Sequence, residues 1–212
     1  MSKIKDVKLN CPECGAEGEF TLWESVNKQL SPESAEKVKS GEIFKWTCPK
    51  CGKTFTVPYS MLYHDMDIPL MIYLLTNQLD LSKSAFGREA MFQKDYTYRA
   101  VYDIDDLREK ISIFEDGLDD RGVELVKYVY THQQKPQEIP DGTLLRYVGK
   151  IEGKGMLLQC IHPDIKENRT MIIPFEMYDN MVSDGLHEQV FGIQDGFSQV
   201  TQDYLCSIMD KH

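Results

Sequence analysis

Two short segments of this sequence share one pattern, Cys11-Pro12-Glu13-Cys14-Gly15 and Cys48-Pro49-Lys50-Cys51-Gly52. In each segment two residues separate the cysteines, so both sulfurs can bind one ion from a single turn. The final glycine tolerates the positive φ that such a turn tends to require, and the proline lowers the entropy lost on ordering. Together the segments supply the ligand set of a closed tetrahedral zinc site: Cys11, Cys14, Cys48 and Cys51.

The two pairs are far apart in the sequence, with 33 residues between Cys14 and Cys48. Common four-cysteine patterns have about 15–20. Doubling a loop costs only about 0.6 kcal/mol of closure entropy, whereas structural zinc supplies on the order of 10 kcal/mol. We therefore predict Zn²⁺ as the cofactor. Four thiolates leave no open position for water or substrate, so Lewis-acid catalysis at the metal is not expected.

The alternatives to zinc are a redox dithiol, structural disulfides and another metal. A thioredoxin-like redox pair opens a helix within a βαβ pattern, whereas both cysteine pairs here lie between segments with strand character. The chain after Met1 has no apolar signal-peptide core. A cytoplasmic location is therefore expected, and in a reducing compartment paired cysteines favour metal binding over disulfides.

The elements around the cysteines predict a zinc-ribbon-like small β domain over residues 1–82. Residues 19–23 alternate polar and apolar side chains, as a half-buried strand does. A short helix is expected from Ser31 and Pro32 to Gly41. The remaining predicted strands cover residues 42–46, 53–57, 59–63 and 70–75.

The rest of the chain, residues 83–212, predicts a second α+β region, so the fold class is α+β. Residues 76–94 read as a loop with one helical turn, and residues 96–102 as a strand. A helix pair is expected to begin at Asp103 and Asp119 and to end in a polar connector over residues 131–142. The elements expected beyond it are a β-hairpin over 143–148 and 155–161, a strand over 171–173 and a helix over 197–210.

Composition excludes several classes of protein and of partner. The chain has 212 residues, is 42% hydrophobic and carries a net charge of −10, which excludes collagen-like, coiled-coil and wholly disordered proteins. Residues 1–60 hold nine lysines against eight acidic side chains, so the remainder is strongly acidic. Any contact with nucleic acid must therefore come from the first third. The longest apolar stretch has six residues, far below the roughly 20 of a membrane helix.

Residues 11 to about 127 resemble the bacterial CpXC domain family, named for its Cys-Pro-x-Cys pair. The similarity rests on both cysteine segments and Gly41, and on four further stretches: Trp23-Glu24-Ser25-Val26-Asn27, Leu62-Tyr63-His64-Asp65, Leu107-Arg108-Glu109-Lys110-Ile111 and Gly117-Leu118-Asp119-Asp120-Arg121. The resemblance implies a zinc-ribbon-like domain. The resemblance supports the prediction of a zinc site and implies no particular catalysed reaction.

Three other groups of side chains could carry chemistry. His64 stands beside Asp65 and Asp67, which suggests a general base or a second metal site, or else a strand end whose polar groups bond the turn. A second group lies where the two predicted helices meet. We interpret it as helix caps and a solvated face, with ion pairing across the helix junction as the alternative. Its members are Asp116, Asp119, Asp120, Arg121 and Glu124. A third group combines aromatic and basic side chains and suggests a surface that binds single-stranded nucleic acid by stacking and charge. Core packing is the favoured interpretation of its aromatic members. The group consists of Trp23, Phe44, Trp46 and Phe55 with Lys3, Lys5, Lys8, Lys45, Lys50 and Lys53.

The leading hypothesis for function is a zinc-stabilised binding or scaffold module that presents surfaces to another protein. A nucleic-acid-binding ribbon is the second hypothesis, disfavoured by the acidic charge. The third is an enzyme that uses His64 and nearby carboxylates, with the ribbon only as support. We assign no catalytic residue, and Cys160 and Cys206 are expected to be buried packing.

Overall fold

The computed structural model describes residues 2–76, 92–132, 139–165, 169–192 and 196–209. The fold is α+β, as the sequence predicts, with three sheets and several helices in these ranges. The chain divides into two compact units, Met1–Arg108 and Glu109–His212. The boundary expected at residue 82, and most of the predicted 76–94 loop, lie outside the described residues.

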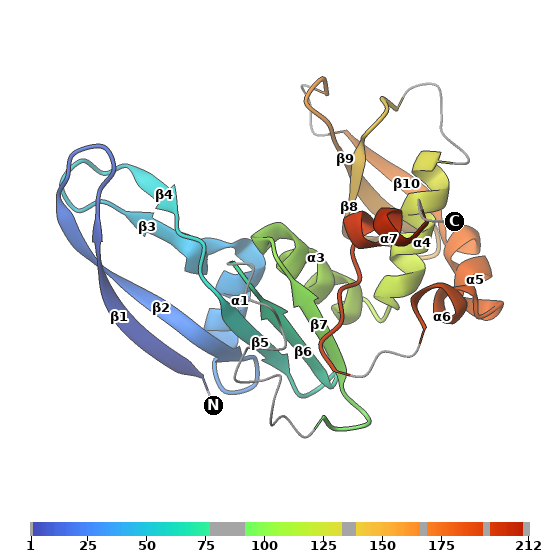
Figure 1. Ribbon diagram of the computed structural model, residues 1–212, viewed down its shortest axis with the longest axis horizontal. Helices are drawn as coiled ribbons and strands as arrows, with labels where there is room; N and C mark the ends of the chain where they lie inside the picture. The colour runs from blue at the N-terminus through green and yellow to red at the C-terminus, as the bar shows by residue number, and fades with distance from the viewer. Residues whose placement is uncertain (1, 77–91, 133–138, 166–168, 193–195, 210–212) are drawn as a thin grey trace. The chain divides into compact units, whose positions relative to one another are not determined.

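The first unit is built on a five-stranded sheet in the order β1-β2-β5-β6-β7. Its strands are β1 (Lys3–Asn10), β2 (Glu17–Asn27), β5 (Met61–Asp65), β6 (Leu70–Leu74) and β7 (Thr97–Val101). The pairs β1–β2 and β5–β6 are antiparallel, whereas β2–β5 and β6–β7 are parallel. Figure 1 shows β1 and β2 continuing well beyond the other three strands as a long ribbon.

A short hairpin lies beside the far end of this ribbon (Figure 1). It consists of β3 (Lys45–Thr47) and β4 (Thr54–Thr56), which pair antiparallel around the second cysteine segment. The strand predicted over residues 42–46 is wrong in its first half, because Glu42–Phe44 form a 3₁₀ turn, η1. This turn buries the adjacent residues Ile43 and Phe44 together, which a strand with one face in solvent does not do. We call β1 to β4 with the two cysteine segments the arm.

Helix α1 (Pro32–Ser40) begins and ends where the sequence predicts. Pro32 occupies the first turn, and Gly41 follows the helix in the left-handed conformation. Ser31 stands at the N-cap position without a side-chain capping bond, since its hydroxyl contacts that of Ser2 at 2.9 Å. The helix buries Ala35 and Val38.

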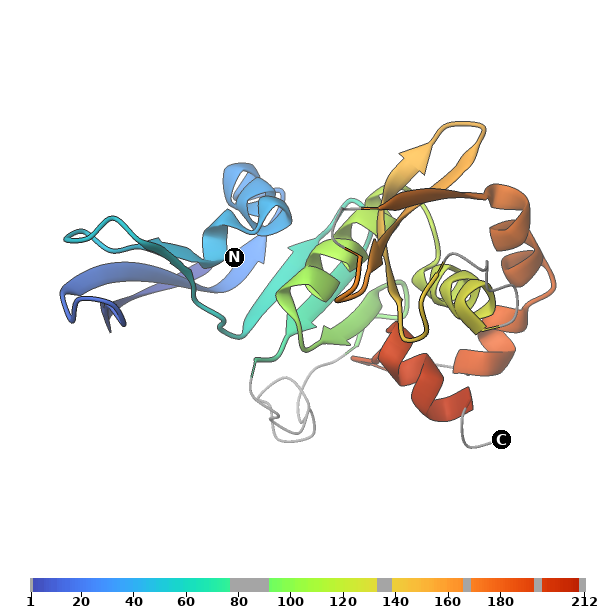
Figure 2. The same cartoon turned by 90° about the horizontal axis from the view of Figure 1, so that it is seen from above.

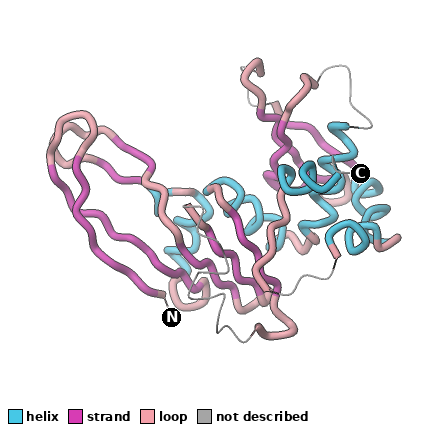
Figure 3. Tube along the Cα trace, viewed as in Figure 1, coloured by secondary structure: helices cyan, strands magenta, loops and turns pink. Residues whose placement is uncertain are grey.

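The strand pair predicted over 59–63 and 70–75 is confirmed as β5 and β6, with β5 shifted two residues toward the C-terminus; Met61 lies opposite Leu74 and Asp65 opposite Leu70. Burial alternates along both strands. The fully buried apolar side chains of this pair form the centre of the first unit: Met61, Tyr63, Leu70, Ile72 and Leu74. Figure 3 shows the sheet as a continuous set of magenta strands.

The second unit has a three-stranded antiparallel sheet in the order β10-β9-β8. The predicted hairpin is confirmed as β8 (Leu144–Ile151) and β9 (Gly155–Ile161), and the third strand as β10 (Thr170–Pro174). The helices are α3 (Ile104–Glu115), which begins in the first unit, α4 (Asp120–His132), α5 (Phe175–Ser183), α6 (Leu186–Phe191) and α7 (Gln202–Met209). Of these, α5 and α6 were not predicted. The predicted connector starts within α4, and residues 133–138 lie outside the described ranges.

In the part of the second unit that the structure describes, helices pack against one face of this sheet. Val123 and Val126 of α4 and Tyr178 of α5 share a buried cluster with Leu145, Tyr147, Met156, Leu158, Cys160 and Ile173 of the strands. Figure 2 shows α5 directly following β10. The helix at the end of the chain, predicted over 197–210, is confirmed as α7. Within the described ranges, no helix has the length and apolar character needed to cross a bilayer.

Candidate metal centre

The two cysteine segments fold into matching knuckles, which we call the first knuckle (residues 11–15) and the second knuckle (residues 48–52). In each, the amide of the first cysteine donates to a carbonyl five residues later, at 2.9 Å in both cases. The amide of the glycine donates back to the first cysteine, at 2.9 Å in the first knuckle and 3.0 Å in the second. Gly15 and Gly52 both have φ of 70°, which confirms the prediction for these positions.

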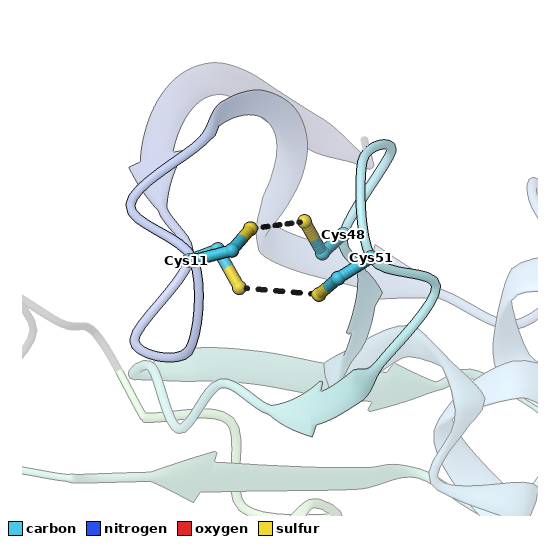
Figure 4. A group of neighbouring side chains, drawn as sticks. Cys11, Cys48 and Cys51 are labelled. Atoms are coloured by element: carbon cyan, nitrogen blue, oxygen red, sulfur yellow. Dashed lines mark hydrogen bonds between the residues drawn. The ribbon is translucent and has the colours of Figure 1, made fainter.

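The side chains of Cys11, Cys48 and Cys51 point toward one another across the two knuckles (Figure 4). All four Sγ atoms lie within 4.8 Å of one another. Cys11 Sγ is 3.6 Å from Cys51 Sγ, and Cys14 Sγ is 3.7 Å from Cys48 Sγ. Sulfurs bound to one ion at about 2.3 Å in a tetrahedron are separated by about 3.8 Å, so the cluster fits a metal site.

The same distances exclude disulfides between these cysteines. A disulfide requires sulfurs about 2.05 Å apart, and all six cysteines are free thiols. Neither knuckle opens a helix: the first lies between β1 and β2, and the second between β3 and β4. The geometry of a thioredoxin-like pair at a helix start is therefore absent from both knuckles.

Backbone amides and neighbouring thiols act on the ionisation of the cluster. The backbone N–H of Cys51 lowers the pKa of the Cys48 thiol to about 6, and the amide of Lys50 also donates to that sulfur, at 3.4 Å. The Lys53 backbone N–H lowers the pKa of Cys51, but burial and the neighbouring thiols outweigh it and raise this pKa to about 11. Four thiols in one place oppose each other's ionisation, and a bound cation removes that opposition.

The second knuckle is fixed against β2 by one aromatic side chain and one glycine. Trp46 of β3 is buried and donates its indole N–H to the Glu19 carbonyl at 3.0 Å. A Cβ at Gly18 would lie 2.8 Å from the Trp46 ring and 2.9 Å from Pro49 Cδ, so no larger residue fits without a shift. Because Gly18 follows the first knuckle closely, these contacts hold the two knuckles face to face.

His64 and Asp65 do not form the acid–base pair that the sequence suggests. Neighbouring strand residues point to opposite faces, and the buried Asp65 carboxylate accepts from Lys28 Nζ and Gln29 Nε2, both at 2.7 Å. These bonds lower its pKa although burial acts in the opposite direction. Asp67 contributes its amide to Asp65 at 2.9 Å. The strand-end interpretation therefore describes Asp65 and Asp67 best.

The contacts of His64 come from two residues that the sequence analysis did not connect with it, Asn27 and Tyr96. Asn27 Oδ1 accepts from the Leu30 amide, so its Nδ2 faces His64 Nδ1 as a donor at 3.1 Å. The imidazole then carries its proton on Nε2, which is 3.1 Å from the Tyr96 hydroxyl. Burial lowers the pKa of His64. Because Asn27 and Tyr96 lie more than 30 residues from His64, no local pattern could have identified them.

The aromatic side chains considered for nucleic-acid stacking belong largely to the core. Phe44 is fully buried and Trp46 is 5% exposed, which confirms the core interpretation for both. Two lysines near the knuckles pair with carboxylates, Lys8 with Glu17 and Lys53 with Glu13, and Lys3 at the other end of β1 pairs with Glu24. The surface around the knuckles is therefore of mixed charge.

In the second unit, a buried ionic cluster joins α3 to α4. Lys110 Nζ lies 2.8 Å from Glu124 Oε1 and 3.3 Å from Asp120 Oδ2, and all three side chains are inaccessible to solvent or nearly so. Lys127 Nζ contacts Glu124 at 3.1 Å and Glu109 at 2.5 Å. Burial lowers the pKa of Lys110, but the three nearby carboxylates outweigh it and raise the pKa.

The expectation of a solvated face is therefore wrong for Asp120 and Glu124, and pairing across the helix junction describes them. Asp119 does cap α4, since its carboxylate accepts from the Arg121 amide at 2.9 Å. The sequence did not identify Lys110 and Lys127 as partners. The ammonium groups meet the carboxylates only when α3 and α4 pack together, so the pairing cannot be predicted from their spacing in the sequence.

Comparison with known families finds one whose matched region includes the residues that form the cysteine cluster. The family model described as "CpXC protein" matches residues 9–127, which is more than half of the chain and includes all four cysteines. Comparison with curated proteins and with solved structures finds no match. The chain therefore belongs to the CpXC protein family.

Proposed function

We propose that this protein binds one structural Zn²⁺ through Cys11, Cys14, Cys48 and Cys51, and that the metal holds the arm in shape for contact with another protein. The observation that carries the proposal is the gathering of four Sγ atoms within 4.8 Å of one another. Tetrahedral sulfur sites hold zinc or iron. A closed four-thiolate site stabilises a fold and takes no part in catalysis.

The arm needs a metal because it has little core of its own. All eight residues of β1 are exposed or only half-buried. Each strand of the hairpin has three residues, and two of the three are exposed in both. Metal binding supplies folding free energy where apolar burial is insufficient. The cytoplasm, as a reducing compartment, keeps such thiols available to the metal, and we propose that location.

Metal analysis of the purified full chain tests the first part of the proposal. We expect one zinc per chain, with no visible absorption of the kind that iron–sulfur sites give. Cys48→Ser should lose most of the zinc and lower the midpoint of thermal unfolding. Cys160→Ser is the matched control, because Cys160 is a buried cysteine of the second unit and should leave the zinc content unchanged. Full zinc occupancy in Cys48→Ser contradicts the assignment.

A partner protein is favoured over nucleic acid by two observations. Phe44 and Trp46 are buried, although Phe55 is only half-buried, and Lys8 and Lys53 are paired with carboxylates. Titration with a fluorescent single-stranded oligonucleotide distinguishes the two. We expect no binding at physiological salt. Tight binding whose affinity falls steeply as salt rises would favour the nucleic-acid hypothesis instead.

An enzyme that uses His64 with its neighbouring carboxylates receives less support. Asp65 is committed to Lys28 and Gln29, and a depressed pKa of His64 is explained by burial. The contacts of the imidazole, with Asn27 and Tyr96, link β2 and β5 to the residue before β7. We assign His64 a structural role in the first unit.

A further inference from the structure

One histidine of the first unit is held in a single proton arrangement by its neighbours. Asn27 Nδ2 donates to His64 Nδ1 at 3.1 Å, because the oxygen of this amide already accepts from the Leu30 amide at 3.0 Å. A proton on Nδ1 would therefore face the hydrogens of the Asn27 amide. On the other side of the ring, Nε2 lies 3.1 Å from the Tyr96 hydroxyl, whose oxygen accepts its proton. The contacts thus select the neutral imidazole.

The Asn27 side chain cannot turn around without losing a hydrogen bond. Asn27 is only 3% exposed. Its backbone amide donates to the Ser2 hydroxyl at 3.1 Å, and its carbonyl accepts from the Ser31 amide at 2.9 Å. A rotation that brought Oδ1 to His64 would take this acceptor from the Leu30 amide. Protonation of the imidazole at Nδ1 must therefore break either the bond to His64 or the bond to Leu30.

These bonds lie in the turn that joins β2 to α1. Strand β2 ends at Asn27, and α1 begins at Pro32. Asn27 lies opposite His64 in the parallel pairing of β2 with β5, and the Lys28 amide donates to the His64 carbonyl at 2.9 Å. The histidine is thus connected to the turn through both its side chain and its backbone. A change in its protonation acts on this turn first.

Two kinds of influence set the pH at which the imidazole gains a proton. Burial and the positive charge of the amino terminus lower the pKa of His64, whereas the charge of Asp65 raises it. Asp65 points to the other face of β5, and its carboxylate is paired with Lys28 Nζ at 2.7 Å. Burial prevails, so the pKa of His64 lies below its ordinary value of 6.5.

The side chains that face the imidazole from the neighbouring strands carry no charge near neutral pH. Met71 of β6 lies opposite His64, and Tyr98 of β7 lies opposite Met71. The centroid of the Tyr96 ring is 5.6 Å from that of the imidazole. Phenols keep their protons in this range of pH. The titration of His64 is therefore governed by its burial and by the Asn27 contact.

We propose that His64 and Asn27 form a proton-operated latch on the turn between β2 and α1, closed while the imidazole is neutral and opened when Nδ1 gains a proton. The folded protein binds this proton less readily than the unfolded chain does. The stabilising effect of the latch is therefore full above 6.5 and is lost as the pH falls to the folded pKa. The inference goes beyond the interaction role given above, and the latch uses none of the cysteines.

Histidine NMR on the full chain tests the proposal. The ring Cε1 signal of His64 reports its protonation between about pH 8 and about pH 5, and His64→Gln identifies the signal by its loss. We expect a midpoint below 6.5 in the parent. Asn27→Asp should move it above 6.5, because a carboxylate can accept from the Leu30 amide and from a protonated Nδ1 together. The signal of His162, in the second unit, is the internal control and should not move.

Amide hydrogen exchange of the turn tests the consequence. Mass spectrometry follows peptides that cover residues 27–31 at about pH 7.5 and about pH 5.5. His64→Gln is the matched control, since glutamine accepts from Asn27 Nδ2 but does not titrate. On going to the lower pH, protection in the parent should fall about fivefold relative to this control, the size expected for one hydrogen bond. In Asn27→Asp the direction should reverse.

Three results overturn the proposal. They are a His64 midpoint at or above 6.5 in the parent, an unchanged midpoint in Asn27→Asp, and an equal change of protection in the parent and in His64→Gln. Zinc is measured in the same samples. Because every variant keeps the four cysteines, any loss of metal in acid acts on all of them alike and cancels in the comparison. One zinc per chain with an unchanged midpoint in Asn27→Asp refutes this inference alone.

Discussion

At the scale of single residues, the four cysteine sulfurs are gathered by two knuckles, and these knuckles are positioned by residues from other segments. The spacing of each pair, and the glycine that follows it, define a knuckle by local geometry alone. Gly15 and Gly52 accordingly share the same positive φ. The contacts of Gly18 with Trp46 and Pro49 depend on the packing of segments distant in the sequence, and no local pattern reports them.

Asp65 gives a prediction whose sign depends on pH. Its pKa is lowered in the folded protein, so its stabilising effect is full above the ordinary value of about 4 and is lost as the pH falls through the folded pKa. Asp65→Asn should therefore lower the free energy of unfolding at pH 7, and the difference from the parent should shrink toward pH 3.

Urea denaturation of metal-free protein at both pH values measures this effect without interference from zinc release. Asp67→Asn is the control, since Asp67 donates to Asp65 through its backbone amide, which the substitution keeps. A difference between Asp65→Asn and the parent that is as large at pH 3 as at pH 7 contradicts the account of this carboxylate.

At the scale of elements, alternation and capping residues located most strands and helices. The errors have physical causes. Strand β1 was not predicted because its first four residues are all exposed, and only Val7 and Leu9 near its end alternate as half-buried positions. Residues 42–44 have strand-like composition, but they bury two consecutive side chains against the core of the first unit. Tertiary packing decided the conformation there.

The junction between β2 and the second knuckle gives a prediction at this scale. Gly18→Ala should lower zinc affinity about tenfold or more. The added methyl group would push the Trp46 ring and Pro49 away from β2, and the second knuckle would move with them. Competition with a zinc chelator of known affinity measures the change. Unchanged affinity would mean that the arm adjusts freely and that these contacts do not position the knuckle.

The buried ionic cluster between α3 and α4 gives a second prediction at the scale of elements. Lys110→Met should destabilise the second unit by about 3–5 kcal/mol, because it leaves the Asp120 and Glu124 carboxylates buried without this ammonium. Lys150→Met removes a partly exposed pair with Asp116 and should cost at most about 1 kcal/mol. Equal losses of unfolding free energy in the two variants would contradict the importance assigned to burial.

At the scale of the whole molecule, composition and element order were sufficient for the α+β class but not for the pairing of distant strands. Strand β7 follows the undescribed residues 77–91 and lies parallel to β6 in the first sheet. Parallel pairing across a long connection leaves no mark in local sequence. The two compact units meet in sequence at residues 108 and 109.

This organisation predicts that metal removal affects the units unequally. A strong zinc chelator should increase amide hydrogen exchange in the arm, whereas amides of α4, β8 and β9 in the second unit should keep their protection. Exchange followed by mass spectrometry resolves the two sets of peptides. Equal loss of protection in both units would show that the metal stabilises the chain as one cooperative body.

The central claim is that four thiolates from two knuckles bind one zinc ion. X-ray absorption at the zinc edge of the purified full chain tests it most directly. The account predicts four sulfur neighbours at about 2.3 Å and no nitrogen or oxygen ligand. A protein without zinc, or a zinc ion with fewer than four sulfur ligands, would contradict it.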